Sequence, residues 1–343
     1  MALTPSCGVR DAGADPFCER PGPRFETCKK VLGGHFRFES NSAALLDLVE
    51  AAYGGLPPQL LPNAVQQFNV ELRLVPRRSP PGAAEPAPVG MQSGADLLCG
   101  VMDASNYAIL MPLQHRALIV ASEDMLDRPY HLRYELIEFA VFTLATRGLG
   151  LVPLHGACVG WQGRGIVLLG ASGSGKSTLA LHSLLDGLDL LAEDAVFVQP
   201  QSMLATGAAN YLHVQADALR FVDDDGARRW VGEAPVIRRR SGVEKFEADV
   251  RRGRGRLASG PLQLAGAVFV SGEPAADADA LLHPVPGAAV AARLELAQPY
   301  ASGQPGWHCF ARGIVQLGAH ELRRGRHPRA CVAALRRLLG AGP

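Results

Sequence analysis

The chain has 343 residues, a formal net charge of +1, 48% hydrophobic residues and 20% charged residues. This length is typical of about two domains, and the near-zero charge gives no global attraction to nucleic acid or to a membrane surface. The seven cysteines form no C-x-x-C pair, which favours reduced thiols over disulfides or a zinc site. We see neither a secretory signal nor an apolar run long enough to cross a membrane. We therefore expect a cytoplasmic protein that binds neither nucleic acid nor membrane.

The first part of the chain divides into a tail and a small domain. Residues 1–30 are rich in Gly, Pro, Asp and Arg without periodicity, so we expect a disordered tail there. Residues 31–130 are expected to form a small α+β N-terminal domain without a catalytic motif. Its expected elements are a strand at 35–38, a helix that begins after Asn41 or Ser42 and ends before Gly54, a half-buried strand at 68–74, an exposed loop at 76–94, and a hairpin at 107–111 and 117–120.

Residues 131–343 are expected to form the second domain, which carries the function. Its first strands are predicted to be antiparallel neighbours, because the turn between them leaves no room for a crossover helix. Residues 189–198 are predicted to form a strand, a turn with two acids, and a second strand. The other expected elements are a helix at 130–147, the two antiparallel strands at 151–159 and 165–169 with their turn at 162–165, further strands near 211–214, 219–222 and 267–270, and a C-terminal helix at 328–339.

A glycine-rich motif organises this second domain. Residues 165–178 read Gly-Ile-Val-Leu-Leu-Gly-Ala-Ser-Gly-Ser-Gly-Lys-Ser-Thr and contain G-x-x-x-x-G-K-[ST], the phosphate-binding P-loop pattern. This chemistry needs a buried strand, a loop whose backbone N–H groups turn toward an anion, and a helix N-terminus. The residues expected to bind ATP are Gly170, Ala171, Ser172, Gly173, Ser174, Gly175, Lys176, Ser177 and Thr178. The alternative is a chance glycine-rich turn before a helix.

Two acids, Glu193 and Asp194, follow where the strand after the motif's helix is expected. Three features together resemble the catalytic domain of HPr kinase/phosphorylase and its kinase-like relatives. These are the His155-Gly156 pair, the Gly-Ala-Ser-Gly-Ser-Gly-Lys-Ser motif, and the Leu-Ala-Glu-Asp run that ends at Asp194. The resemblance covers roughly residues 151–198. It implies an α/β fold with an HPr-kinase/phosphoenolpyruvate-carboxykinase-like P-loop domain.

The resemblance also implies a reaction and a role for each residue. The family transfers the γ-phosphoryl group of ATP to a hydroxyl, with Mg²⁺. Lys176 would hold the phosphates, Ser177 and Asp194 would bind Mg²⁺, and Glu193 would take the proton of the acceptor. His155 would touch the phosphates or a metal-bound water, or it is a buried, hydrogen-bonded histidine. The family's downstream R-G-[LI]-G segment has no counterpart here, so we expect an acceptor other than HPr, either a serine of a peptide or protein or a small-molecule alcohol.

The sequence leaves open other functions and the role of one further segment. A nucleotide-binding regulator that transfers no phosphate is the main alternative to a kinase. A transporter ATPase is disfavoured, because no Leu-Ser-Gly-Gly-Gln signature occurs. Residues 228–256 hold ten basic residues against four acids. We interpret them as a solvated loop or as a loop that closes over ATP or an anionic acceptor and supplies an arginine. Homo-oligomer formation is also left open.

Overall fold

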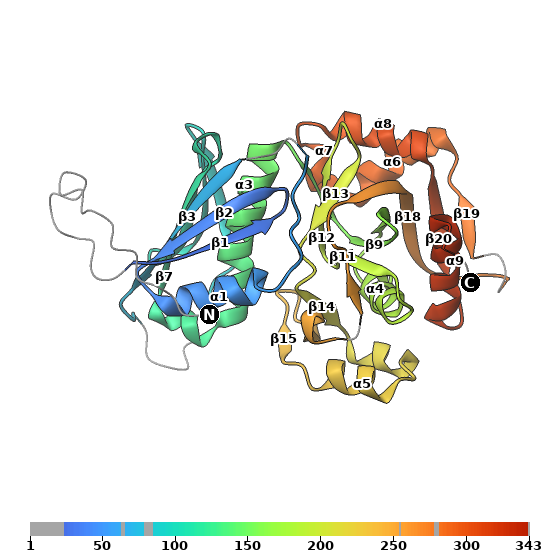
Figure 1. The fold of residues 1–343 in the computed structure, drawn as a ribbon, viewed down its shortest axis with the longest axis horizontal. Helices are drawn as coiled ribbons and strands as arrows, with labels where there is room; N and C mark the ends of the chain where they lie inside the picture. Colours follow the sequence, from blue (N-terminus) through green and yellow to red (C-terminus); the bar gives the residue numbers. More distant parts are fainter. Residues whose placement is uncertain (1–23, 63–65, 79–84, 254, 278–280, 342–343) are drawn as a thin grey trace. The chain divides into compact units, whose positions relative to one another are not determined.

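The chain is a mixed α/β protein that divides into two compact units (Figure 1). The computed structural model describes residues 24–62, 66–78, 85–253, 255–277 and 281–341. Among them, unit 1 holds the chain up to Gly54 and from residue 66 to Leu149, and unit 2 holds Gly55–Pro62 and the chain from Gly150 onward. No helix within these described ranges is long and apolar enough to span a membrane.

The boundary between the units follows the helix expected at 130–147 instead of preceding it. This helix is α3 (Phe139–Leu149), preceded by α2 (Pro129–His131) and the π-helical η3 (Leu132–Glu138). Its buried side packs on strands of the unit 1 sheet, so it belongs to unit 1. The short segment Gly55–Pro62 in turn joins unit 2, which sequence patterning did not suggest.

Unit 1 is a seven-stranded sheet with helices on one face. The strand order is β1-β2-β3-β7-β6-β5-β4, in which β2, β3 and β7 are parallel and the other neighbours antiparallel. Phe36, Phe38 and Phe68 are buried on the face that α1 (Ala43–Tyr53) and α3 cover. The strands are β1 (Phe25–Val31), β2 (Gly34–Ser40), β3 (Gln67–Val75), β4 (Gly90–Gly94), β5 (Leu97–Asp103), β6 (Asn106–Met111) and β7 (Arg116–Ser122).

Most elements expected in unit 1 are confirmed, and two expectations are wrong. The early strand, the helix after it, the alternating strand and the hairpin form as predicted. The segment 25–31 is strand β1 rather than tail, and 90–94 is strand β4 rather than loop. Neither strand has a fully buried face, so neither carries a period-two apolar signal, and pairing with a neighbouring strand holds each in place. Residues 1–23 of the predicted tail lie outside the described residues.

Unit 2 is built on a ten-stranded mixed sheet. Its main path is β17-β11-β9-β10-β18-β13-β12-β8, and β20 pairs with both β18 and β19. As predicted, β9 and β10 are antiparallel neighbours across a tight turn. The strands are β8 (Val152–His155), β9 (Ala157–Trp161), β10 (Arg164–Leu169), β11 (Asp189–Ala192), β12 (Ala195–Gln199), β13 (Leu204–Gly207), β17 (Arg256–Leu257), β18 (Leu262–Pro274), β19 (Leu282–Pro284) and β20 (Ala319–Arg324).

The expectation of one continuous strand at 151–159 is wrong. The strand breaks at Gly156, because β8 pairs with β12 whereas β9 pairs with β10 and β11. The two halves therefore occupy separate positions along the sheet path. This break places His155 at the end of β8, opposite Ala195 at the start of β12.

Two hydrophobic cores flank the central strand β10. Ile166 and Leu168 point into the core that contains α4 and α9, and Val167 and Leu169 point into the core that contains α8. This alternation is the one expected for a strand that is buried on both faces. The helices are α4 (Lys176–Leu185), α6 (Gly287–Ala297), α7 (Pro299–Ser302), α8 (Trp307–Leu317) and α9 (Pro328–Leu339), and α9 has the predicted limits. Figure 1 shows α6, α7 and α8 grouped together, apart from α4 and α9.

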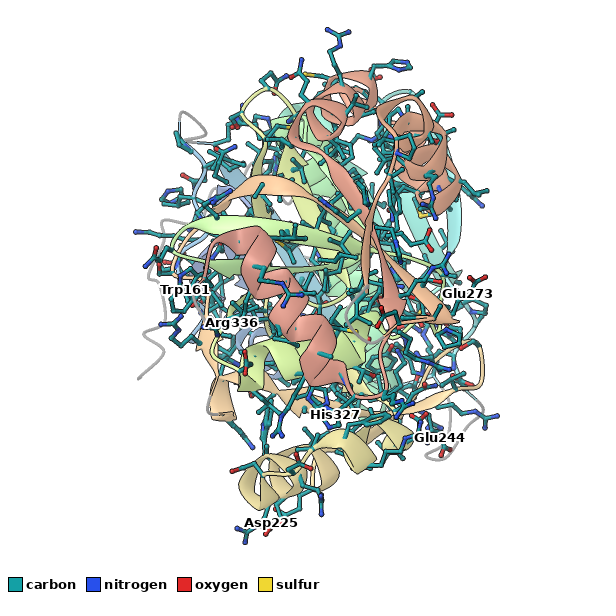
Figure 2. The ribbon with its side chains drawn as sticks, turned by 90° about the vertical axis from the view of Figure 1, so that its right-hand side faces the viewer. Trp161, Asp225, Glu244, Glu273, His327 and Arg336 are labelled. Carbon is teal, nitrogen blue, oxygen red and sulfur yellow. The ribbon has the colours of Figure 1, made fainter. Side chains whose placement is uncertain are left out.

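A small three-stranded sheet completes unit 2. Its order is β14-β16-β15, formed by β14 (Tyr211–Val214), β15 (Val236–Arg238) and β16 (Glu244–Asp249), with α5 (Asp225–Gly232) beside it. Figure 2 marks Asp225 at the start of α5 and Glu244 at the start of β16. The described residues of the basic stretch 228–256 are therefore mostly ordered as part of α5, the β15–β16 hairpin, a 3₁₀ turn and β17, rather than as one loop. The strand expected at 219–222 is wrong, because Ala216–Phe221 forms a 3₁₀-helix.

Candidate functional site

The glycine-rich loop joins the end of β10 to the start of α4, which is the predicted order of strand, loop and helix. Gly170 and Gly175 have φ of 153° and 102°, in the region that favours glycine. A Cβ on Gly170 would lie 2.5 Å from the carbonyl oxygen of Val270, so no side chain fits there. Ser174 Oγ in the loop is buried and has no hydrogen-bond partner among the described residues. The first N–H groups of α4 also have no partner within the helix, so the loop offers donors to an anion.

Lys176 is the first residue of α4, and its side chain folds back over the loop. Its Nζ donates to the carbonyl oxygens of Gly170 at 2.7 Å and Ala171 at 3.0 Å. Burial lowers the pKa of Lys176, and the nearby carboxylates of Asp194 and Glu193 oppose that effect. The side chain thus holds a cation above the loop and close to both predicted acids.

Glu193 lies in a buried chain of hydrogen bonds that begins at the loop helix. Ser177 Oγ donates to Glu193 Oε1, and Glu193 Oε2 lies 3.1 Å from Nδ1 of His213. The other ring nitrogen of His213 lies 3.3 Å from Glu247 Oε1. Burial by itself lowers the pKa of His213, but the hydrogen bonds to Glu193 and Glu247 outweigh it and raise this pKa to about 9. The ring is therefore an imidazolium at neutral pH, and it donates to both carboxylates.

Asp194 has a different set of partners from its neighbour. Its Oδ2 accepts a hydrogen bond of 2.8 Å from Arg239, and its Oδ1 lies 3.3 Å from Nδ1 of His155. Its carbonyl oxygen accepts from the N–H of Gly156 at 3.0 Å. Burial raises the pKa of Asp194, but Arg239 and His155 more than offset this and hold the pKa well below its usual range. Asp194 is therefore an ionised carboxylate near the end of β8.

The side chains of Glu193 and Asp194 can both face one site because neither residue lies within a strand. Glu193 and Asp194 form the turn between β11 and β12, as the sequence predicted. Adjacent residues within a strand point to opposite faces. Since β11 ends at Ala192, the backbone is free to turn, and Glu193 contacts the α4 side while Asp194 contacts the β8 and hairpin side.

The small sheet brings a polar face to these acids. His213 on β14 lies opposite Glu247 on β16, and Lys245 is two residues before Glu247, so these side chains share one face. Lys245 lies opposite Ile237, and Arg239 follows two residues later on the same side of the hairpin. Lys245 is close enough to Lys176 to lower its pKa. On the opposite face, the apolar residues Leu212, Val214 and Ala248 enter the core.

Hydrogen bonds between Gln298 and the backbone hold His155 in position. Gln298, after α6, accepts from the N–H of His155 at 2.8 Å and donates to its carbonyl oxygen at 2.9 Å. The imidazole itself is 57% exposed. This exposure excludes the alternative of a buried histidine and leaves the ring directed toward Asp194 at the mouth of the site.

Four contributors to the site were not singled out from the sequence: His213, Glu247, Arg239 and Gln298. A faint signal existed for His213, which interrupts the apolar pair Leu212 and Val214 in a predicted strand. Glu247 and Arg239 lay inside the basic stretch, where charge counting gave no reason to select either. Gln298 carries no local signal, because its partner His155 is distant in sequence.

The oxygen donors present suit Mg²⁺ bound together with a nucleotide. Ser177 and Glu193 lie side by side next to the loop. In the described part of the chain, no group of three or more His, Cys, Asp or Glu side chains could hold a metal on its own. Mg²⁺ characteristically takes one or two protein ligands and completes its shell with phosphate oxygens and water. The adjacent oxygens of Ser177 and Glu193 fit that pattern.

No protein-family model matches the chain, and no curated protein matches it. The assignment of this site therefore rests on the geometry of this chain alone. Within unit 2, that geometry brings together the predicted residues Lys176, Ser177, Glu193, Asp194 and His155.

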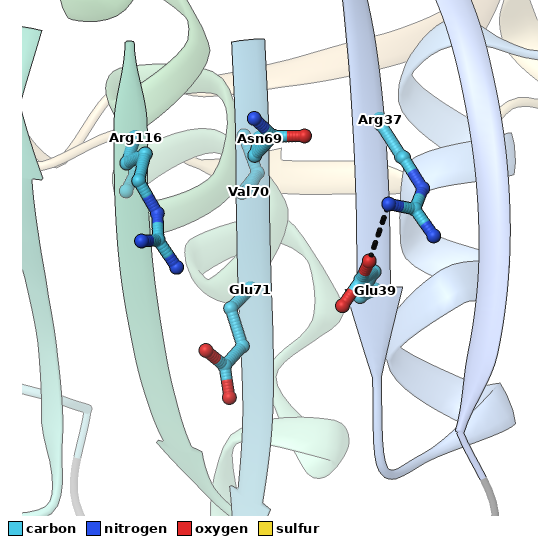
Figure 3. Close-up of a pocket in the computed structure, with 7 residues that line it drawn as sticks. Arg37, Glu39, Asn69, Val70, Glu71 and Arg116 are labelled. Atoms are coloured by element: carbon cyan, nitrogen blue, oxygen red, sulfur yellow. Dashed lines mark ion pairs between the residues drawn. The ribbon is translucent and has the colours of Figure 1, made fainter. Parts of the chain in front are cut away.

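A separate hollow lies in unit 1 and contains none of these residues. It is about 300 Å³ in volume and lies on the face of the sheet opposite α1 and α3 (Figure 3). Its lining includes Arg37, which forms an ion pair of 2.9 Å with Glu39, together with Glu71 and Arg116 from neighbouring strands. Acidic and basic side chains alternate across it, so it offers no field of one sign to a charged ligand.

Proposed function

We propose that the chain is an ATP- and Mg²⁺-dependent kinase that transfers the γ-phosphoryl group to a hydroxyl acceptor. The observation that carries this proposal is the glycine-rich loop before α4, with Lys176 folded over it and two carboxylates at its mouth. The fold that we propose for unit 2 is an HPr-kinase/phosphoenolpyruvate-carboxykinase-like P-loop domain. The acceptor that we propose is a serine of a peptide or protein other than HPr.

The loop and the helix N-terminus would bind the phosphates of ATP. The phosphate oxygens of ATP would accept hydrogen bonds from backbone N–H groups of the loop and from the ammonium of Lys176. Ser174 Oγ, buried without a partner among the described residues, supplies a further donor inside the loop. Ser177 would bind Mg²⁺, which neutralises charge on the transferring phosphoryl group when it is bound.

The contacts favour an exchange of the roles that the family resemblance assigns to the two acids. Glu193 accepts from the Ser177 hydroxyl, so it lies on the metal side. Asp194 lies with His155 at the open mouth, where an acceptor hydroxyl can reach it. We therefore assign proton acceptance to Asp194, helped by His155, and metal support to Glu193. A proton acceptor of low pKa suffices, because the transition state of phosphoryl transfer is loose and the proton leaves late.

The transfer balances in one step. The acceptor oxygen forms a bond to the γ-phosphorus while the bond to the β,γ-bridging oxygen breaks. The electron pair of that bond leaves with ADP, and the proton of the acceptor passes to Asp194. The chain's own contribution is to position the reactants and to balance their charge.

Calorimetry of nucleotide binding tests the first part of this proposal. Wild-type protein should bind ATP·Mg, and Lys176→Ala should lose at least about tenfold in affinity, since a desolvated charge-assisted contact contributes more than 1.4 kcal/mol. The exposed Arg164, at the opposite end of β10, provides a matched control, and Arg164→Ala should bind normally. Equal affinities of wild type and Lys176→Ala for ATP·Mg would show that the nucleotide does not bind at this loop.

A further inference from the structure

The hairpin between β15 and β16 carries an arginine that the proposed mechanism has not yet used. Arg239 follows β15, and its backbone is fixed by hydrogen bonds across the turn: its N–H donates to Val243 O at 2.9 Å, and its carbonyl accepts from Gly242 at 2.8 Å. Its guanidinium reaches out of the hairpin to Asp194 at 2.8 Å. This contact joins the hairpin to the acidic turn between β11 and β12.

The contact lies at the mouth of the site rather than in a sealed core. The side chains of Arg239 and Asp194 are 18% and 21% exposed. Lys245 lies on the same face of the hairpin, close to Lys176, so cations from the hairpin and from the loop helix face the same space. A triphosphate held by the loop would place its last phosphoryl group among these cations and the two carboxylates.

Asp194 does not depend on Arg239 alone for its position. His155 approaches its other carboxylate oxygen, and Gly156 binds its backbone carbonyl. Arg239 can therefore change partner while the carboxylate stays in place. A guanidinium is suited to this exchange, because its planar fork fits carboxylate and phosphate oxygens equally well and stays charged in both states.

We infer that Arg239 is a catalytic residue that leaves Asp194 for the γ-phosphoryl group of bound nucleotide and stabilises the charge that spreads over that group during transfer. The exchange has two consequences. It adds positive charge where negative charge develops, and it frees one oxygen of Asp194 to accept the acceptor's proton. The inference rests on the proposed function, and it makes the small sheet part of the catalytic machinery.

A transition-state analogue tests this inference without the acceptor. The probe is ADP·Mg with aluminium fluoride, compared with ADP·Mg alone by calorimetry. Transition-state analogues bind at least about a hundredfold more tightly than ground-state ligands. We expect wild type to show such a gain in affinity. In Arg239→Ala this gain should be at least about tenfold smaller, whereas the affinity of the variant for ADP·Mg alone should differ from wild type by less than about threefold. Arg239→Lys should lie between them, because it keeps the charge but not the fork.

Arg238→Ala is the matched control. Arg238 is the adjacent residue, is exposed, and points to the other face of the hairpin, opposite Glu244. It should keep the full gain. If Arg239→Ala also keeps the gain, or if wild type shows none while binding ADP·Mg, Arg239 only positions Asp194 and the inference is overturned. If wild type does not bind ADP·Mg at all, the proposed function fails and the inference fails with it, so the two failures are distinguishable.

Discussion

The two neighbouring acids of the site have different partners. Glu193 lies between the hydroxyl of Ser177 and the imidazolium of His213, whereas Asp194 lies between Arg239 and His155. On the proposed mechanism, these two adjacent carboxylates serve two different tasks. The conservative amide variants separate those tasks, because each keeps the size of the side chain but loses the negative charge and one of its two accepting oxygens.

We predict that Glu193→Gln raises the Mg²⁺ concentration needed for half-maximal activity. Asp194→Asn should instead lower the maximal rate at least about a hundredfold at saturating Mg²⁺, the lower end of the contribution of general acid–base catalysis. A Mg²⁺ titration of transfer by both variants measures this. The reverse pattern would restore the assignment implied by the family resemblance, with Glu193 as the proton acceptor.

His182, in the last turn of α4, gives a prediction at acid pH. Burial, and then the charges of His327 and Arg329, lower the pKa of His182 to about 4. The unfolded value is about 6.5, so protonation favours the unfolded chain below that pH. The contribution of His182 is thus fully present above about pH 6.5 and is lost as the pH falls toward 4.

We therefore expect His182→Phe to gain stability relative to wild type as the pH falls from about 6.5 to about 4, with a constant difference above pH 7. Urea unfolding at several pH values measures it, and the difference between the two proteins cancels the titration of other groups. A difference that stays flat down to pH 4 would show that His182 protonates in the folded chain as easily as in the unfolded one.

At the scale of elements, Trp161 at the end of β9 ties three segments together. The guanidinium carbons of Arg256 and Arg336 lie 4.9 and 5.5 Å from its ring centroid, and Figure 2 shows Arg336 beside it. Each arginine also donates to a backbone carbonyl of the α4–β11 turn, at Gly187 and Asp186. This turn leads from the loop helix to the two acids, so the cluster fixes the path between them.

Trp161→Ala should lower the free energy of unfolding of unit 2 by about 2–3 kcal/mol, from lost packing and two cation–π contacts. Trp161→Phe should keep most of the stability, since it retains a ring face for the arginines. Urea unfolding followed by the fluorescence of the remaining tryptophans measures both variants. A loss below about 0.5 kcal/mol for Trp161→Ala would show that the arginines hold the turn without the ring.

Locally encoded elements were predictable, and long-range pairings were not. The glycine-rich loop with its strand and helix, the acidic turn and the C-terminal helix carry their signals within a few residues, and all formed as expected. The break at Gly156 depends on β8 pairing with β12, which no local pattern records. His213 and Arg239 reach the acids because a separate small sheet forms, and its register comes from strand pairs far apart in sequence.

At the scale of the whole molecule, the chain passes between the two units more than once. The segment Gly55–Pro62 belongs to unit 2 although unit 1 sequence flanks it on both sides. Gln59 in this segment is 5% exposed, and its amide donates to Ala258 O at 3.0 Å. All three tryptophans, Trp161, Trp230 and Trp307, lie in unit 2, so their fluorescence reports on this unit alone.

Gln59→Ala should therefore lower the stability of unit 2 by about 1–2 kcal/mol, because it leaves a buried carbonyl without its donor. Urea unfolding read by tryptophan fluorescence measures this change. Gln114→Ala, at an exposed position in unit 1, is the control and should leave the tryptophan transition unchanged. Equal transitions for Gln59→Ala and wild type would show that unit 2 does not need this segment.

The most direct test of the account is transfer itself. Purified protein is incubated with Mg²⁺ and ATP labelled in its γ-phosphoryl group, against pools of peptides and of small-molecule alcohols, and products are identified by mass. We predict a labelled phosphate ester on a serine-containing peptide with wild-type protein and none with Lys176→Ala. If the protein binds ATP·Mg but no pool yields a labelled ester, the proposed kinase activity is contradicted. A nucleotide-binding regulator that transfers no phosphate would then be the better account.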